Sequence, residues 1–473
     1  MRFLLYILII TMMMVSCQIK DDNAPSPDEA FIKYYGELTS YEASDIEIVY
    51  NATGEVPESL IVFGTVTTER GDDDYFILQT DLVGNVLAST SFGLSDTLDL
   101  DDDGLADDWT GDGVADRFRA DEIAGQIQHI PGLGYAIIGS SAINISALGV
   151  SDWKWLSYGF VDEALQPITT LGDTLLFDLA QNNAGELLDI VGNDIITLPV
   201  GEGVLLVGGE EFGAGGSIHF DNFYTKISLS DGVVFNQIQG ISGAGEDDLL
   251  VRAFEKSNGN LVMIGNSNTP SLLGENGGNN GTNVFYLETD PNGTPVNSAA
   301  YGLADPANSI VFNEEVNDVI KTTSGFSIVG TSSTSQNQQF AFIMNLSNGG
   351  TYLNSNSHDS SAFTVDIESA PLETIGEGVT QAIDNDLILL GQYLSFVDNN
   401  LSRGNEGLFT KFDQASNPVE GEESFFGLSD GDDTIIDAVT LPDGKIVAVA
   451  NVDFGGGVKL ISIIKLNADG SLD

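Results

Sequence analysis

The sequence is short of basic residues. It holds 16 Lys and Arg against 71 Asp and Glu among 473 residues, which gives a formal net charge of −55. Nucleic acids are bound mainly by Lys and Arg side chains that displace counterions from phosphates. The composition therefore argues against a nucleic-acid partner, and it disfavours free adsorption onto an anionic bilayer for the same reason.

Cysteine and proline are also scarce. Cys17 is the only cysteine, so no disulfide can form within the chain, and 13 Pro stand against 54 Gly. Glycine without much proline suits many tight hairpins better than a low-complexity linker. Hydrophobic residues make up 42 % of the chain, with 25 Phe and 13 Tyr. This is enough for a large core, and the composition favours an all-β fold.

The apolar run at the N-terminus is shorter than a membrane-spanning helix. The run Phe3–Val15 has 13 residues and follows Arg2, whereas a spanning helix needs about 20. A basic start and a short apolar middle are typical of a secretory signal. The stretch Met14–Cys17 resembles the lipobox of bacterial lipoproteins, although Met14 stands where Leu is commonest.

The lipobox resemblance implies cleavage after Ser16 and a lipid on Cys17. Lys20, Asp21 and Asp22 resemble the signal that sends some lipoproteins of Gram-negative bacteria to the outer face of the outer membrane. We therefore expect a signal peptide over 1–16, a lipidated Cys17 with a flexible tether over 17–30, and a surface-exposed protein anchored in the outer membrane. Alternatively, Lys20, Asp21 and Asp22 are part of an ordinary polar tether and carry no sorting signal.

A short apolar strand ending in a small residue recurs seven times in the body of the chain, at intervals of 57 to 75 residues. Each copy follows an alternating segment across a tight turn, and a third and often a fourth strand come after it. The small residues are Gly64, Gly139, Gly208, Gly265, Gly330, Gly391 and Ala450.

Seven repeats of four strands predict a seven-bladed β-propeller over 31–473. The last repeat stops after its third strand, while Phe31–Gly36 has the pattern of a fourth strand with none before it. The N-terminal strand is therefore expected to complete the last blade and close the ring, which removes an exposed sheet edge. The repeats resemble secreted bacterial propeller repeats of about 60 residues; that resemblance implies no activity, and we expect a monomer.

Loop lengths differ between the two ends of the predicted ring. Turns between strands one and two and between strands three and four are tight, as at Asn258-Gly259 and Asp443-Gly444. Connections between strands two and three and between blades lie at the other end and are long. We expect functional contacts there. The long loops are Ser141–Asp152, Glu210–Asp221, Asn266–Thr282, Tyr393–Glu406 and the insertion Asp96–Asp121.

The insertion carries the sharpest chemical pattern. Carboxylates at alternate positions precede Gly104 in the manner of an EF-hand-type calcium loop, because a hard cation needs several oxygen ligands at once. The expected ligands of the first copy are Asp99, Asp101, Asp103, the carbonyl of Leu105, and Asp107. An overlapping second copy would use Asp108, Asp112 and Asp116.

This segment resembles the thrombospondin type-3 and dockerin-like calcium repeats of bacterial surface proteins. It departs from them at Thr110, where the twelfth position usually carries a bidentate acid, and the second copy has Arg119 at that position. Both departures lower the expected calcium affinity. The alternative to a calcium site is a solvated acidic loop.

Other acidic and aromatic residues can be interpreted as functional or as structural. Aspartates that follow the fourth strands could form a carboxylate ring at the channel mouth, but their recurrence favours caps on the connections between blades. Trp153 and Trp155 favour blade packing over a sugar-stacking platform. The aspartates in question are Asp96, Asp247, Asp248, Asp305, Asp430, Asp432 and Asp433.

Catalytic motifs are missing from the sequence. The three histidines are His129, His219 and His358, with no H-E-x-x-H, and no G-x-S-x-G elbow is present. We therefore favour a non-catalytic binding or adhesion module for a glycan or protein ligand. An accessory part of an outer-membrane assembly and a carboxylate-based polysaccharide-degrading enzyme remain as alternatives.

Calcium is predicted to stabilise the protein. Calcium titrated into the chelator-treated protein should raise its melting temperature and change tryptophan emission, because Trp109 lies within the acidic loop. Asp101→Asn should weaken both responses. A melting temperature and an emission spectrum that are the same with calcium and with chelator would contradict the prediction.

Overall fold

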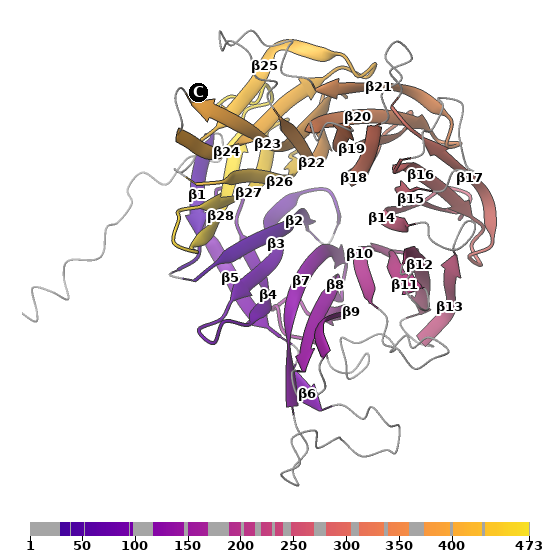
Figure 1. Ribbon diagram of the computed structural model, residues 1–473. Coiled ribbons are helices and arrows are strands. Elements are labelled where there is room, and N and C mark those ends of the chain that lie inside the picture. The colour runs from indigo at the N-terminus through magenta and orange to yellow at the C-terminus, as the bar shows by residue number, and fades with distance from the viewer. Residues whose placement is uncertain are drawn as a thin grey trace, which may run out of the picture.

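Seven antiparallel β-sheets surround a central axis in the computed structural model (Figure 1). The described residues contain no helix, and therefore none that could cross a membrane. The structure describes residues 29–472 except 38, 52, 94, 98–116, 146–149, 169–188, 200–202, 213–218, 229–231, 240–246, 269–280, 304–311, 335–338, 359–372, 398–400 and 428–430.

The first four sheets follow one another along the chain. The first contains β2 (Tyr41–Tyr50), β3 (Pro57–Thr67), β4 (Asp73–Thr80) and β5 (Val86–Phe92). The second contains β6 (Ser95–Thr97), β7 (Arg117–Ile130), β8 (Gly134–Ile145) and β9 (Val150–Val161). The third contains β10 (Ile190–Thr197), β11 (Val204–Phe212), β12 (His219–Ser228) and β13 (Gly232–Gln239). The fourth contains β14 (Asp248–Glu255), β15 (Leu261–Ser267), β16 (Asn283–Thr289) and β17 (Pro295–Tyr301).

The last three sheets complete the ring. The fifth contains β18 (Phe312–Lys321), β19 (Gly325–Thr334), β20 (Gln339–Ser347) and β21 (Tyr352–His358). The sixth contains β22 (Thr374–Gln381), β23 (Leu387–Val397), β24 (Leu401–Phe412) and β25 (Pro418–Phe426). The seventh contains β26 (Asp433–Thr440), β27 (Ile446–Asp453), β28 (Lys459–Leu466) and, from the N-terminus, β1 (Phe31–Tyr35). The predicted seven-bladed propeller and its closure by the N-terminal strand are confirmed.

The hydrophobic core lies between the blades. Seven clusters of buried side chains each join two neighbouring sheets, and the cluster at the closing seam joins the first sheet to the seventh. Second strands are buried on both faces, as in Leu60–Phe63, where every side chain has 0 % exposure. This explains why they read as continuous apolar runs instead of alternating patterns.

The recurring small residue that ends the apolar run within each second strand lies at a close approach. A Cβ atom on Gly208 would lie 1.9 Å from the carbonyl oxygen of Val191, and one on Gly391 would lie 1.9 Å from that of Ile375. In both cases the neighbouring strand is the first strand of the same blade, which bulges at this level. The repeat signature in the sequence therefore marks the bulges around the axis.

Polar contacts between blades repeat at the turns between third and fourth strands. The hydroxyl group of Tyr35 donates to the carbonyl oxygen of Gly84 at 2.6 Å, and that of Tyr301 donates to Gly350 at 2.6 Å. Both glycines have positive φ, +76° and +78°, which turns the carbonyl toward the preceding blade. Each such turn is thereby fastened to its neighbour.

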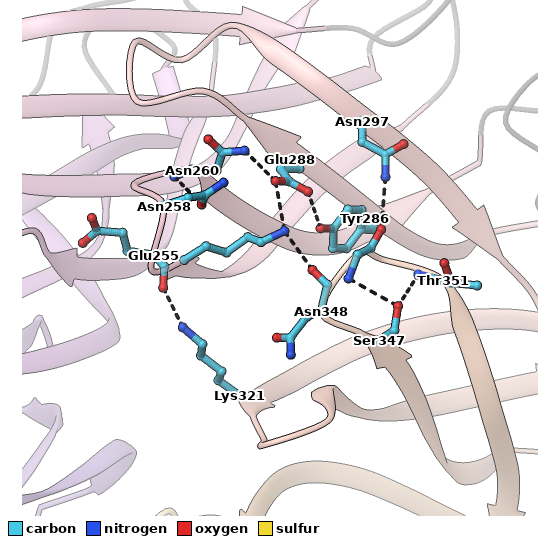
Figure 2. Close-up of polar contacts among 12 residues, drawn as sticks. Glu255, Asn258, Asn260, Tyr286, Glu288, Asn297, Lys321, Ser347, Asn348 and Thr351 are labelled. Atoms are coloured by element: carbon cyan, nitrogen blue, oxygen red, sulfur yellow. Dashed lines mark hydrogen bonds and ion pairs between the residues drawn. The ribbon is translucent and has the colours of Figure 1, made fainter.

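The joint between the fourth and fifth blades has a larger network (Figure 2). The Lys256 Nζ atom donates to Glu288 Oε1 at 3.0 Å and to the carbonyl oxygen of Asn348 at 2.9 Å. The Tyr286 hydroxyl and the Asn260 amide also donate to the Glu288 carboxylate, at 3.0 and 2.6 Å. Because Asn348 belongs to the turn of the next blade, this lysine joins two sheets.

Two features differ from the sequence predictions. Three of the predicted long loops largely continue the second and third strands of their blades. Strands β8 and β9 pair as far as Ile145 and Val150, and strands β11 and β12 pair as far as Phe212 and His219. The third extension is β23 with β24, paired to Val397 and Leu401. In the second sheet, β6 adds a strand beside β7, and the chain after β9 begins to pair on the outer side, where Pro167 bridges Val161.

The seam between the first and seventh blades provides a test of ring closure. The Asn451 side chain accepts from the Ala43 amide at 2.7 Å and donates to the Ala43 carbonyl at 3.0 Å. Asn451→Ala leaves both backbone groups without this partner, so we expect it to destabilise the protein by about 1–2 kcal/mol in urea unfolding. Asn297→Ala is the control, since Asn297 makes one exposed contact of 3.2 Å. Equal unfolding midpoints for the two variants would contradict the prediction.

Candidate functional site

The first strand of every blade lines the axis of the ring and contains an irregularity in its register. An extra residue in a strand bends it and re-aims side chains. Because the seven irregularities lie at equivalent positions, they bring a matching set of residues to the axis. The residues at the irregularities are Ser44, Gly125 with Gln126, Asn193, Val251, Asn317, Glu377 and Ile436.

Four aspartates follow these irregularities, on the first, third, fifth and seventh blades. Asp45, Asp194, Asp318 and Asp437 are each at most 9 % exposed. Each carboxylate accepts a hydrogen bond from a backbone N–H group of the following blade. The donors are Ile127 for Asp45 at 2.9 Å, Ala253 for Asp194 at 2.7 Å, Val379 for Asp318 at 2.8 Å and Ile46 for Asp437 at 3.4 Å.

Arg252 occupies the equivalent position on the fourth blade. Its Nε atom lies 2.6 Å from Asp318 Oδ1, and its Nη1 atom lies 3.8 Å from Asp194 Oδ1. The guanidinium therefore bridges the third and fifth blades. Burial opposes its charge, but the carboxylates of Asp318, Asp194 and Asp45 outweigh burial and raise the pKa of Arg252. We call these five residues the axial ring.

The axial ring holds more acid than base, and the pKa values of three of its carboxyl groups, Asp45, Asp194 and Asp437, are raised. Burial raises the pKa of Asp194 to about 6, although Arg252 opposes the shift. Burial and the nearby charges of Asp45 and Asp318 raise the pKa of Asp437 well above its ordinary value. Asp437 also hydrogen-bonds Asp45. Burial also raises the pKa of Asp45, although the charge of Arg252 opposes the shift.

The axial ring divides the central channel into two cavities. One, of about 520 Å³, lies toward the end of the propeller that carries the tight turns, here called the turn face. The other, of about 500 Å³, lies toward the end that carries the blade-to-blade connections, here called the connection face. Arg252 and Asp437 line both cavities. The ring therefore forms a floor between them.

The cavity on the connection face is lined by polar side chains from several blades. Burial, followed by the charge of Glu315, raises the pKa of Glu377 to about 7, while a 3.5 Å hydrogen bond from Gln392 opposes the shift. A carboxyl group that titrates near neutrality in a cavity is a candidate for ligand binding or proton transfer. The polar lining consists of Ser44, Gln126, Ser140, Lys154, Asn193, Arg252, Asn266, Glu315, Asn317, Glu377 and Asp437.

A third cavity, of about 570 Å³, lies between the first and second blades at the turn face. Glu47 lines it and accepts a hydrogen bond from the His129 backbone at 2.6 Å. Burial raises the pKa of Glu47 to about 8. The His129 ring lies 3.3 Å from the Glu163 carboxylate and packs on Tyr135, so this histidine has structural partners on both sides.

The predicted calcium ligands and the predicted lipid site cannot be placed. Asp99, Asp101, Asp103, Leu105, Asp107, Asp108, Asp112, Asp116 and Cys17 lie outside the described residues. The structure does describe the base of the insertion, where β6 pairs with Arg117–Arg119 of β7. The two ends of the acidic segment are therefore held together as a β-ribbon. Among the described residues, no cluster of His, Cys, Asp or Glu is arranged to hold a metal ion.

Two of the aspartates between blades, Asp247 and Asp432, accept backbone hydrogen bonds, as a capping role predicts. Asp247 accepts a hydrogen bond from the Phe220 amide at 3.0 Å, and Asp432 accepts one from the Asn405 amide at 2.8 Å. Each carboxylate thus caps a third strand of the preceding blade. Asp248 and Asp433 are buried, and Asp305 and Asp430 lie outside the described residues.

The histidine and the tryptophans singled out in the sequence are buried in the fold. His219 is 6 % exposed at the start of β12, with its Nε2 atom 3.7 Å from Asp221. Trp153 and Trp155 are each 4 % exposed and meet edge to face with ring centroids 4.6 Å apart. The indoles therefore serve blade packing, and no exposed stacking platform is formed by them.

Sequence reasoning missed the axial ring. A signal was available, because Asp194, Asp318, Asp437 and Arg252 each precede the small residue of their repeat by 12 to 14 positions. The first repeat has a longer turn, which displaces Asp45 from that register. What the alignment could not show is that the first strand of each blade faces a common axis.

Comparison with known proteins adds the fold alone. No family model and no curated protein matches the chain. A solved polysaccharide lyase, the PL25 ulvan lyase, is 11 % identical over 93 % of this chain and 97 % of its own, with a TM-score of 0.46. A protein of unknown function from Dyadobacter fermentans DSM 18053 is 16 % identical over 74 % and 94 %, with a TM-score of 0.38. The subtype N10 neuraminidase-like protein of A/little yellow-shouldered bat/Guatemala is 9 % identical over 93 % and 98 %, with a TM-score of 0.35.

Buried carboxyl groups predict that mild acid stabilises this protein. Burial raises the folded-state pKa of Asp194 to about 6, Glu377 to about 7, and Glu47 and Glu314 to about 8. The unfolded values lie near 4, so the folded chain binds more protons between these limits. The stabilisation is complete below about pH 4 and is lost as pH rises through 6 to 8.

Urea unfolding should therefore give at least ~2 kcal/mol more stability at pH 5.5 than at pH 8.5. Glu314→Gln should reduce this difference, whereas Glu58→Gln, at an exposed position on β3, should leave it unchanged. Stability should decline only in stronger acid, where carboxylates with lowered pKa values such as Asp413 and Glu288 become protonated. A protein that is less stable at pH 5.5 than at pH 8.5 would refute the expectation.

Proposed function

We propose that this protein is a non-catalytic binding module of the bacterial outer membrane, held at the cell surface by a lipid on Cys17. Its ligand is a hydroxyl-rich molecule, such as the end of a glycan, that enters the cavity on the connection face. The anchor and the location rest on the sequence pattern at Met14–Cys17.

One observation carries the proposal, namely the cavity of about 500 Å³ at the axis of the connection face, which polar side chains line together with apolar ones such as Val191 and Leu249. Its size lies within the range of small-molecule sites, about 300–1,000 Å³. Amide and hydroxyl groups from different blades converge there, including Ser44, Asn193, Asn266 and Asn317. A ligand with many hydroxyl groups can exchange hydrogen bonds with such a wall.

The axial ring, which forms the floor of this cavity, has a structural role. Each aspartate of the axial ring accepts a backbone hydrogen bond from the next blade, and Arg252 is paired with two of them. These contacts hold the blades in register and leave the upper lining for recognition. Calcium bound by the acidic insertion would add to the stability of the protein.

An array of neutral, cationic and sulfated glycans tests the proposal with the full-length protein. Ser44→Trp fills part of the cavity and should reduce binding at least tenfold, because the indole occupies ligand space. Ser89→Trp, on the exposed surface of the outer strand β5, is the matched control and should bind normally.

Binding that is equal in the two variants would place the ligand elsewhere and overturn the proposal. Release of reducing ends from any glycan would instead favour a polysaccharide-degrading enzyme. A silent array together with membrane proteins that co-purify with both variants would favour an accessory role in an outer-membrane assembly.

A further inference from the structure

We propose that the cavity on the connection face selects ligands that carry a primary ammonium group, as free amino sugars do. This inference rests on the proposed function and names the ligand class of that same site. It follows from which atoms of the lining are already engaged and which are left to meet a ligand.

Two asparagines of the cavity lining use their side-chain nitrogen atoms to hold the next blade. The Asn193 amide donates from Nδ2 to the carbonyl oxygen of Leu250 at 2.6 Å, and Asn317 donates from Nδ2 to that of Gly376 at 2.6 Å. Their donors are therefore engaged in holding the next blade. Within the described residues, the Oδ1 atoms accept no hydrogen bond, so they remain as acceptors for a ligand.

Two carboxyl groups from adjacent blades line the same cavity. Glu315 lies on β18 and is exposed, while Glu377 lies at the irregularity of β22 and is half-buried. In the part of the chain that the structure describes, the Glu377 carboxyl has one hydrogen bond, from Gln392 at 3.5 Å, and Glu315 has none through its side chain. Both groups are acceptor-only when ionised.

Positive charge in the lining does not balance these acids. Arg252 is paired with Asp318 and Asp194 below the cavity, which leaves Lys154 as the other cation of the lining. A cavity with excess negative charge and low-dielectric walls attracts cations and repels anions. The protein as a whole, at −55, adds to the same field.

An ammonium group fits this wall by its hydrogen bonds as well as by its charge. It offers three donors and no acceptor, which matches carboxylate and amide oxygens. Hydrogen bonds from a charged donor to a carboxylate are roughly twice as strong as neutral ones. A bound ammonium would also favour the ionised form of Glu377, whose pKa of about 7 is raised first by burial and then by Glu315.

Calorimetric titration of the full-length protein with three probes tests the inference. The probes are the glucosamine trimer, its fully N-acetylated counterpart and putrescine. The free trimer should bind at least tenfold more tightly than the acetylated one. Glu377→Gln and Glu315→Gln should each reduce that preference at least fivefold, whereas the exposed Glu58→Gln serves as the matched control and should not change it.

The outcomes separate this inference from the proposed function. Tight binding of putrescine would show that the ammonium group alone suffices, while binding of the trimer alone would assign recognition to the amino sugar. Equal affinity for the free and acetylated trimers, or an unchanged preference in both Glu variants, would overturn the inference. Sensitivity of acetylated-trimer binding to Ser44→Trp would then leave the proposed function standing. Absence of binding by all three probes would overturn the inference.

Discussion

Burial between neighbouring blades is the constraint on which the rest of the structure depends. Each sheet has two apolar faces and can hide them only against the sheets on either side. The second strands are therefore apolar on both faces, as in Leu60–Phe63, and the core consists of seven separate layers with no single centre. A ring of this kind is stable only when closed, because an open end would expose one complete apolar face to water.

Close packing around the axis creates the polar site as a by-product. Seven strands that converge on one line are crowded, and each relieves the crowding with an irregularity that forces a small residue on its partner, as at Gly208. The same irregularities turn Asn193, Asn317 and Glu377 toward the cavity. Asn193 fixes the next blade with its nitrogen, and its oxygen is an acceptor that the proposed ligand would meet.

The sequence was sufficient for the fold because burial on both faces leaves a strong local pattern. Seven apolar runs ending at residues such as Gly64 and Gly265 predicted seven blades, and the unmatched strand at Phe31 predicted closure. The axial ring was not predictable in the same way. Asp437 and Ile46 are separated by 391 positions and meet only through closure. Nor could spacing alone distinguish a long loop from a long β-ribbon, since Ile143 and Trp153 are compatible with either.

The pairing of β1 with β28 has a consequence for the order of events during folding. The first strand of the propeller has its partner in the last one, across more than 400 residues, as between Phe31 and Lys465. Contacts of such long sequence separation form late and slowly. A chain emerging from synthesis or export can assemble its middle blades as they arrive, but it cannot complete the circle before its final strand is present. The ring therefore closes only when the whole propeller has been made. A chain that ends anywhere before β28 keeps an unpaired strand edge and an exposed blade face.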